Sequence, residues 1–156
     1  MEYEITRRDG TSHVVLFDEA DLSLVSQHRW FIRQRSADLF YAATNVRRTD
    51  GTRSLLNMHT LLVGLDADHI NHNGLDNRRV NLRTATRSQQ VANRRLSTSA
   101  QSKYKGVSPL NGRYLARCAG KYLGTYATDL EAAQAYDDEA RESFGEYAFL
   151  NLEKSQ

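Results

Sequence analysis

Residues 68–93 read DHINHNGLDNRRVNLRTATRSQQVAN, and this stretch decides how the rest of the chain is interpreted. It holds an Asp-His pair, a loop rich in Asn and Gly, an Asn-Leu-Arg segment and a polar C-terminal part. Its apolar content is too low for a role in a hydrophobic core alone, because buried positions are mostly apolar. Its polar side chains are therefore the first candidates for function.

Local patterns in this stretch predict two short strands and a loop. On an extended strand Asp68 and His69 point to opposite faces, although a bent strand end can bring both towards one cavity. The Asn- and Gly-rich residues 71–77 accept turn and left-handed conformations, which predicts a loop. Residues 80–85 alternate apolar and polar side chains, as a short return strand does.

A helix is expected to follow the second strand. Thr86 and Gln89 have the spacing of a capping box, so we expect a helix from about Arg87 to about Arg95. The product is a strand, a loop, a strand and a helix. Gln90 would lie one turn into this helix and face the start of the first strand.

This order of residues resembles the ββα-metal (His-Me) finger of HNH endonucleases, in particular the phage and intron-encoded homing type. The resemblance implies that His69 is the general base and that Asp68 is a metal ligand. It also implies that Asn81 braces the loop and orients the catalytic histidine. The last metal position of the family is normally Asn or His, and here it falls on Gln90, whose side chain is one methylene longer than that of Asn.

The chemistry of phosphodiester hydrolysis suits these residue types. The reaction needs an in-line water, an acceptor for its proton and charge stabilisation at the phosphate. A histidine can be neutral and basic near physiological pH, so His69 can activate the water. One carboxylate and one amide oxygen suit a single Mg²⁺, with Mn²⁺ as an alternative. Cys118 is the only cysteine, which excludes a zinc site of the Cys₄ type.

Charge in this segment favours a polyanionic partner. The whole chain carries a formal net charge of +2, but residues 68–95 hold six arginines against two aspartates. Clustered positive charge attracts nucleic acid, and we expect double-stranded DNA. The DNA-binding candidates in this segment are Arg78, Arg79, Arg87 and Arg94. His59, further upstream, is either a structural histidine or a DNA contact.

The N-terminal part is expected to complete an HNH domain spanning residues 1–95. The predicted elements are a hairpin over 2–17 with a turn at Asp9-Gly10, a helix capped by Asp18, strands over 31–56 with a turn at Asp50-Gly51, and a short helix over 57–65. Trp30 is expected to anchor the first helix. Residues 96–102 are small and polar, which is typical of a linker.

Residues 103–152 predict a second domain of three short strands and one helix. The strands are expected at 104–107, 113–118 and 121–126, and the helix at about 130–144 with a cap at Thr128 or Asp129. Alternation predicts that Arg113, Leu115 and Arg117 share one face of the sheet. The strand region is basic and the helix acidic, so a DNA partner would meet the sheet.

This second part resembles the APETALA-two/ethylene-response (ERF) DNA-binding domain. The matching segments are Ser-Lys-Tyr-Lys-Gly-Val at 102–107, Tyr-Leu-Gly-Thr-Tyr at 122–126, Glu-Ala-Ala-Gln-Ala-Tyr-Asp at 131–137 and Ala-Phe-Leu-Asn at 148–151. The sheet of that family contacts the major groove. The DNA-binding candidates here are Lys105, Arg113, Arg117, Lys121 and Tyr122.

The sequence thus predicts an α+β protein in two parts: an HNH nuclease domain, and a three-stranded antiparallel sheet packed on one helix that targets it to DNA. A monomer would suffice, and we expect a cytoplasmic protein of a bacterial or phage-infected cell, because no signal peptide or long apolar run is present. Two alternatives stay open. One is a non-catalytic, sequence-specific DNA-binding protein whose HNH site is degenerate at Gln90. The other is an RNA-binding module, which the lack of paired stacking aromatics on the basic sheet face disfavours.

Overall fold

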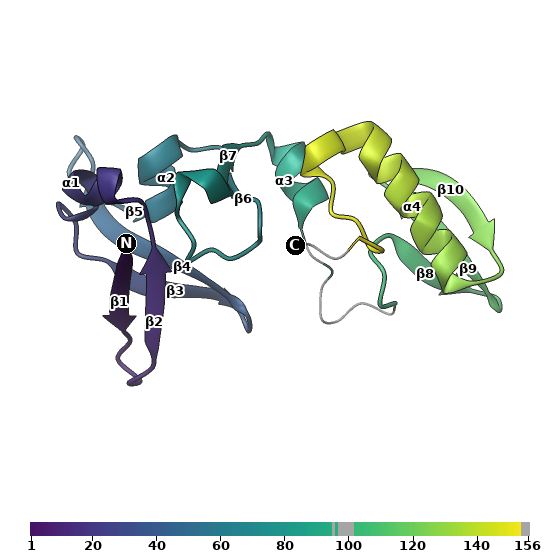
Figure 1. Cartoon of the computed structure of the whole chain (residues 1–156), viewed down its shortest axis with the longest axis horizontal. Coiled ribbons are helices and arrows are strands. Elements are labelled where there is room, and N and C mark those ends of the chain that lie inside the picture. The colour runs from purple at the N-terminus through teal and green to yellow at the C-terminus, as the bar shows by residue number, and fades with distance from the viewer. Residues whose placement is uncertain (95, 97–101, 154–156) are drawn as a thin grey trace. The chain divides into compact units, whose positions relative to one another are not determined.

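The chain folds as two compact units of mixed α and β structure, in agreement with the predicted α+β class. The computed structural model describes residues 1–94, 96 and 102–153 (Figure 1). The units are Met1–Ala85 and Thr86–Gln156, and each is described separately below. The predicted linker over 96–102 lies mostly outside the described residues and stays a prediction. The observed division comes earlier, directly before the helix that the sequence assigns to the HNH domain.

The first unit is built mainly from antiparallel strands (Figure 1). Its strands are β1 (Glu2–Thr6), β2 (Ser12–Leu16), β3 (Phe31–Ser36), β4 (Leu39–Arg47), β5 (Arg53–Asn57), β6 (Ala67–His69) and β7 (Leu82–Thr84). Its helical segments are the 3₁₀ turn η1 (Glu19–Asp21), α1 (Leu22–Val25), α2 (Met58–Val63) and the 3₁₀ turn η2 (Arg79–Asn81). Strands β1 and β2 form a hairpin, β3 to β5 a meander, and β6 and β7 a second two-stranded sheet.

Both predicted Asp-Gly turns form in the first unit, and they share one construction. At the first, Asp9 Oδ1 accepts a hydrogen bond of 3.0 Å from the backbone N–H of Thr11. At the second, Asp50 Oδ1 accepts one of 2.8 Å from the N–H of Thr52. The glycine of each turn has a positive φ, 85° at Gly10 and 82° at Gly51, which glycine adopts without steric cost.

The helix predicted to begin at Asp18 is wrong in length and in its cap. Only η1 and the four residues of α1 form there, and the Asp18 side chain makes no capping hydrogen bond. Its Oδ2 instead accepts a 2.7 Å hydrogen bond from the backbone N–H of Arg79. Trp30 anchors this segment as expected, because its indole N–H donates to Val25 O at 2.8 Å.

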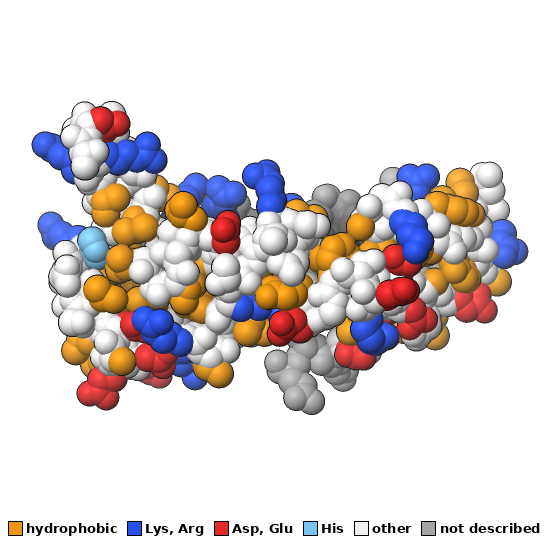
Figure 2. All heavy atoms as spheres, turned by 90° about the horizontal axis from the view of Figure 1, so that it is seen from above, with side chains coloured by type: hydrophobic (Ala, Val, Ile, Leu, Met, Phe, Trp, Pro, Cys, Tyr) orange, Lys and Arg blue, Asp and Glu red, His pale blue; other side chains and the backbone are white. Residues whose placement is uncertain are grey.

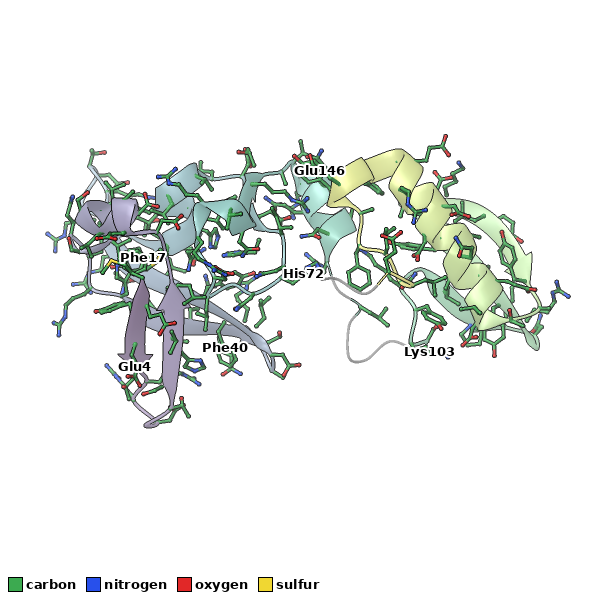
Figure 3. All side chains as sticks on the ribbon, in the orientation of Figure 1. Glu4, Phe17, Phe40, His72, Lys103 and Glu146 are labelled. Atoms are coloured by element: carbon green, nitrogen blue, oxygen red, sulfur yellow. The ribbon has the colours of Figure 1, made fainter. Side chains whose placement is uncertain are left out.

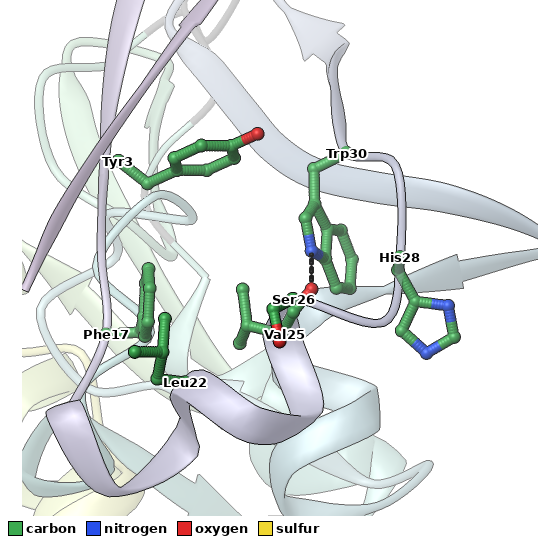
Figure 4. Close-up of a pocket in the computed structure, with 7 residues that line it drawn as sticks. All are labelled: Tyr3, Phe17, Leu22, Val25, Ser26, His28 and Trp30. Atoms are coloured by element: carbon green, nitrogen blue, oxygen red, sulfur yellow. Dashed lines mark hydrogen bonds between the residues drawn. The ribbon is translucent and has the colours of Figure 1, made fainter.

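The core of the first unit is formed by side chains from both of its helices and most of its strands, and a shallow hollow lies beside it. The buried core residues are Ile5, Val15, Phe17, Val25, Trp30, Ile32, Ala42, Met58, Leu62 and Leu82. The hollow, of about 250 Å³, is shown in Figure 4 and lies against Trp30 and Phe17. Its lining holds no Asp or Glu, the carboxylate ligands that divalent metal sites commonly use.

The second unit is a three-stranded antiparallel sheet with a long helix packed on it (Figure 1). Its elements are α3 (Arg87–Asn93), β8 (Val107–Leu110), β9 (Arg113–Cys118), β10 (Lys121–Tyr126), α4 (Asp129–Phe144) and the 3₁₀ turn η3 (Gly145–Tyr147). Strand β9 lies between β8 and β10. The sheet and helix predicted for this part are therefore both present.

The first strand of this sheet begins later than the sequence predicted. It covers Val107–Leu110 rather than residues 104–107. Gly106 has a φ of 75°, which a regular strand does not use, and a Cβ there would lie 2.2 Å from the ring of Tyr136. The backbone therefore bends close over Tyr136, and the strand starts beyond the bend. Pro109 is accommodated because β8 is an edge strand.

Helix α4 begins and packs as the sequence predicts. Thr128 is its N-cap, and the side chains of Thr128 and Glu131 form a complete capping box. Small buried side chains of the helix, Ala132, Ala133 and Ala140, let it lie close to the sheet. The exposed side of this unit that Figure 2 displays carries Asp and Glu side chains interspersed with Lys and Arg. Within the described residues, no helix has the length and apolar character needed to cross a membrane.

Candidate active site

The candidate site lies on the short hairpin of β6 and β7. In its register Asp68 lies opposite Arg83 and His69 opposite Leu82. The His69 side chain is turned inward and is 6% exposed. The Asp68 carboxylate lies 3.5 Å from the guanidinium of Arg83 (Oδ2 to Nη2) and remains partly exposed. The hairpin thus brings a buried imidazole and a half-buried carboxylate together at the end of one strand.

The His69 ring is enclosed by other rings and by an amide. Its Nε2 lies 3.3 Å from Asn77 Oδ1, a hydrogen-bond distance. The ring of His59 meets it edge to face, with 4.7 Å between centroids, and the Tyr41 ring lies 5.8 Å away. Burial lowers the pKa of His69 below its usual range, while Asn77 and the carboxylates of Asp68 and Asp76 act in the opposite direction. The imidazole is consequently neutral at physiological pH.

His59, the second member of this ring cluster, is held neutral more strongly. Burial, together with the smaller effect of the nearby His69, lowers its pKa to about 3. Its Nδ1 is buried without a hydrogen-bond partner, which disfavours a charged ring. His59 lies in the first turn of α2, and its ring packs directly against that of His69. A structural role and a DNA contact both stay predictions for this residue.

The connection between the two strands, residues 70–81, is called the finger loop below. Asn81 closes it from inside: its Oδ1 accepts from the backbone N–H of Asn71 at 2.9 Å, and its Nδ2 donates to Asp76 O at 2.7 Å. The turn between them includes His72, labelled in Figure 3, which has a φ of 63°. Asn81 is therefore in a position to brace the loop, while Asn77 Oδ1 is the side-chain oxygen that lies at hydrogen-bond distance from His69 Nε2.

Asp76 organises the outer side of the finger loop. It is almost fully buried, and both of its oxygens accept from the guanidinium of Arg78 at 2.7 Å. Asn71 Nδ2 donates to the same carboxylate at 3.0 Å. The hydrogen bonds from Arg78 hold the pKa of the Asp76 carboxyl below its usual value, so it is ionised at neutral pH.

Arg78 and Arg79, two of the predicted DNA contacts, also anchor the loop. Arg79 makes a fork-like ion pair with the buried carboxylate of Asp21, with 2.6 Å from Nη2 to Oδ1. The side chains of Arg78 and Arg79 are 47% and 53% exposed, so each combines an internal partner with a surface position. Their contact with DNA stays a prediction.

Close packing fixes the finger loop against the rest of the first unit. Gly74 is buried, and a Cβ there would lie 2.3 Å from Phe40 O and 2.6 Å from the Tyr41 ring. Backbone hydrogen bonds also connect the loop to strand β2: Leu16 N donates to Leu75 O at 2.8 Å, and Asn77 N donates to Leu16 O at 2.7 Å. Any larger side chain at Gly74 would have to move the loop away from Tyr41.

Helix α3 follows β7 in the chain, and its capping box of Thr86 and Gln89 forms as predicted. Gln90, the predicted second metal ligand, lies on this helix within the second unit, whereas Asp68 and His69 belong to the first. The orientation of Gln90 towards β6 stays a prediction. Arg87 and Arg94, predicted DNA contacts, lie at the two ends of α3 and are exposed.

The remaining DNA-binding candidates lie on the second unit, and three of them share a surface. Alternation along β9 exposes Arg113 and Arg117, and the register places Tyr122 of β10 directly opposite Arg117. Tyr122 is 56% exposed. The surface formed by Arg113, Leu115, Arg117 and Tyr122 is called the sheet face below. It is basic and carries one large aromatic ring.

The two lysine candidates have partners elsewhere in the second unit. The ammonium group of Lys105 donates to Val91 O and Ala92 O at the last turn of α3, and burial lowers its pKa to about 8. Lys121 points to the helix side, where its ammonium pairs with Glu139 of α4 at 2.5 Å. Lys105 therefore holds α3 to this unit, and neither ammonium lies on the sheet face.

Sequence reasoning missed Asn77 and Tyr41 as neighbours of His69. Tyr41 is 28 residues from His69 in sequence and reaches it only through the fold, whereas Asn77 is only eight residues away, in the loop that follows β6. The only available signal was the position of Asn77 within the Leu-Asp-Asn-Arg segment. Among the described residues, no group of three or more His, Cys, Asp or Glu side chains is placed to hold a metal ion.

Comparison with known proteins supports an HNH nuclease family. The chain is 29% identical over 150 residues to an uncharacterized HNH endonuclease, L560, of Acanthamoeba polyphaga mimivirus. That match covers 93% of this chain and 77% of the viral protein. No protein-family model and no solved structure matches the chain.

Proposed function

We propose that the protein is a metal-dependent DNA endonuclease of the HNH type with His69 as its general base. The observation that carries this proposal is the buried, neutral His69 ring beside the Asp68 carboxylate, on a hairpin whose loop is braced by Asn81. The similarity to a protein named as an HNH endonuclease supports the same chemistry.

A neutral imidazole can accept a proton, and a protonated one cannot. In the proposed reaction His69 takes a proton from water as the water oxygen attacks phosphorus. The bond from phosphorus to the departing oxygen breaks, and solvent supplies that oxygen with a proton. The rings of Tyr41 and His59 limit the orientations of the base, which lowers the entropy cost of each encounter.

The donor set fits one hard divalent cation, Mg²⁺ or Mn²⁺. The Asp68 carboxylate is 17% exposed and offers oxygen ligands, with the amide oxygen of Gln90 as the proposed second protein ligand. When bound, the metal would supply charge stabilisation at the scissile phosphate. Arg83 already neutralises Asp68, so the carboxylate would have to share its charge between the two cations.

We propose the second unit as the DNA-targeting part, in the manner of an APETALA-two/ERF-like domain. The sheet face supports this role because arginines can bind phosphates or base edges, and an exposed tyrosine can pack on sugar or base. Arg87 and Arg94 on α3 would add phosphate contacts from the same unit. Two weak DNA-binding units on one chain raise the effective concentration of each other on the same duplex.

The test is the conversion of supercoiled plasmid by the full chain with Mg²⁺ or with EDTA. We expect nicking with Mg²⁺, loss of nicking in EDTA and a loss of about 10³-fold in His69→Ala. The matched control is His28→Ala, which removes a histidine from the Trp30 hollow and should leave nicking intact. Nicking that survives in His69→Ala would exclude His69 as the base.

A second candidate function is a non-catalytic DNA-binding protein. It is favoured by the ion pair that already engages Asp68 and by the lack of a three-residue metal cluster among the described residues. Gln90→Asn distinguishes the two candidates, because the shorter amide should raise metal-dependent activity if Gln90 is a defective ligand. A DNA shift on a gel without nicking under Mg²⁺ or Mn²⁺, in both proteins, would favour the binding protein.

A further inference from the structure

Asn77 is the least exposed polar residue of the site, and its hydrogen bonds define its orientation. Its side chain is fully buried at 0% exposure. Its Nδ2 donates to Leu75 O at 3.2 Å, and its Oδ1 lies 3.3 Å from His69 Nε2. A backbone carbonyl can only accept, so the NH₂ end of the amide must face Leu75. The oxygen end must then face His69.

This orientation determines which ring nitrogen of His69 carries a hydrogen. Asn77 Oδ1 is an acceptor, and a hydrogen bond to it requires a hydrogen on Nε2. In a neutral imidazole only one nitrogen is protonated, so Nδ1 must be the nitrogen with the lone pair. The position of the hydrogen on His69 is thus inferred from the two contacts of the Asn77 amide, one to the Leu75 carbonyl and one to the imidazole.

The backbone of Asn77 is held as firmly as its side chain. Its N–H donates to Leu16 O at 2.7 Å, and the neighbouring Asp76 forms a bridge with Leu16 of β2. Arg78 on the other side is tied to Asp76 by two hydrogen bonds of 2.7 Å. Asn77 therefore reaches the His69 ring from a fixed support and cannot follow the ring if the ring turns.

We propose that Asn77 is a positioning residue that fixes the Nε2-protonated tautomer of His69 and so makes Nδ1 the nitrogen that accepts a proton. The catalytic part of this inference rests on the proposed nuclease function, whereas the tautomer does not. The two amides divide their work: Asn81 closes the finger loop, and Asn77 orients the base. A wrong tautomer would turn a donor towards the substrate water and would prevent proton transfer.

The decisive measurement is ¹⁵N NMR of the imidazole of His69 in the full chain at neutral pH. Shifts and two-bond couplings distinguish a pyrrole-like from a pyridine-like nitrogen, and His69→Gln assigns the signals. We expect a pyrrole-like Nε2 and a pyridine-like Nδ1 in the unsubstituted protein. The reverse pattern in the unsubstituted protein would overturn the proposal, whether or not the Asn77 variants fold.

Two substitutions test whether Asn77 is the cause. Asn77→Asp keeps an acceptor and should keep the tautomer, whereas Asn77→Leu removes it and should yield a mixture. For plasmid nicking we expect kcat to fall about 100-fold in Asn77→Leu with KM unchanged, and to recover largely in Asn77→Asp. An unchanged tautomer in folded Asn77→Leu would overturn the proposal. The expected tautomers in a protein that nicks no DNA would instead contradict the nuclease function and leave the role of Asn77 intact.

Discussion

The finger loop and the sheet face are both polar, yet they are built in opposite ways. In the loop, Asn77 and Asp76 are buried and have specific hydrogen-bond partners. On the sheet face, Arg117 and Tyr122 are exposed and lie on a regular strand pair. A buried polar group is costly unless it is paired, so the loop tolerates few substitutions, whereas an exposed arginine costs little to replace. The difference separates a preorganised site for chemistry from a surface for association.

The largest effect is expected where the loop is packed most closely. Gly74→Ala would bring a Cβ to 2.3 Å from Phe40 O, so the loop must move outward. We expect a loss of about 3 kcal/mol in the free energy of unfolding, measured by urea denaturation. Gly64→Ala is the matched control, because Gly64 has open space around it but a φ of 105°. That variant should lose only about 1–2 kcal/mol from backbone strain. Equal losses would mean that close packing does not hold the loop.

Removal of the internal brace should be the next largest effect. Asn81→Ala deletes the hydrogen bonds with Asn71 N and Asp76 O, and we expect a loss of about 2 kcal/mol in the free energy of unfolding. Asn45→Ala, at an exposed position of β4, is the control and should change stability by less than about 0.5 kcal/mol. If the two variants were equally stable, the finger loop would not depend on its amide network.

The histidine pair predicts a pH dependence that the sheet face lacks. The folded pKa of His59 is about 3 against an ordinary value of 6.5, so in that window the unfolded chain binds a proton that the folded chain does not. Stability is therefore full above about pH 6.5 and is lost as the pH falls towards 3. We expect a loss of about 1–2 kcal/mol between pH 7.5 and pH 5, seen in urea titrations. His59→Phe should flatten this slope, and an equally steep slope in that variant would exclude His59 as its source.

Local sequence patterns predicted the elements whose cause is local. The Asp-Gly turns at Gly10 and Gly51 and the capping boxes at Thr86 and Thr128 depend on residues within four positions of one another. The pattern of residues 68–85 likewise predicted the strand, loop and return strand that the structure shows as the β6–β7 hairpin. These features need no knowledge of the rest of the chain.

Features that depend on distant partners were not predictable in the same way. Asp18 has the composition of a helix cap, but its carboxylate is taken by Arg79, 61 residues away in sequence. The contact of Tyr41 with His69 likewise requires β4 to pack beside β6. Periodicity and propensity contain no information on such pairs, so Tyr41 was identified as a neighbour of the candidate base only from the fold.

Substitutions on the sheet face are expected to have the smallest effect on stability. There a variant should lose DNA binding while its free energy of unfolding hardly changes. Arg117→Ala should change the free energy of unfolding by less than about 0.5 kcal/mol, because the side chain is exposed. It should weaken DNA binding in gel shifts and reduce the salt dependence by about one ion, as expected when one phosphate contact is lost. Arg141→Ala removes the same charge from α4, where Arg141 pairs with Glu153, and should leave DNA binding unchanged. If both variants weakened DNA binding equally, the affinity would depend on the net charge of the unit. The sheet face would then be excluded as the specific DNA-binding surface.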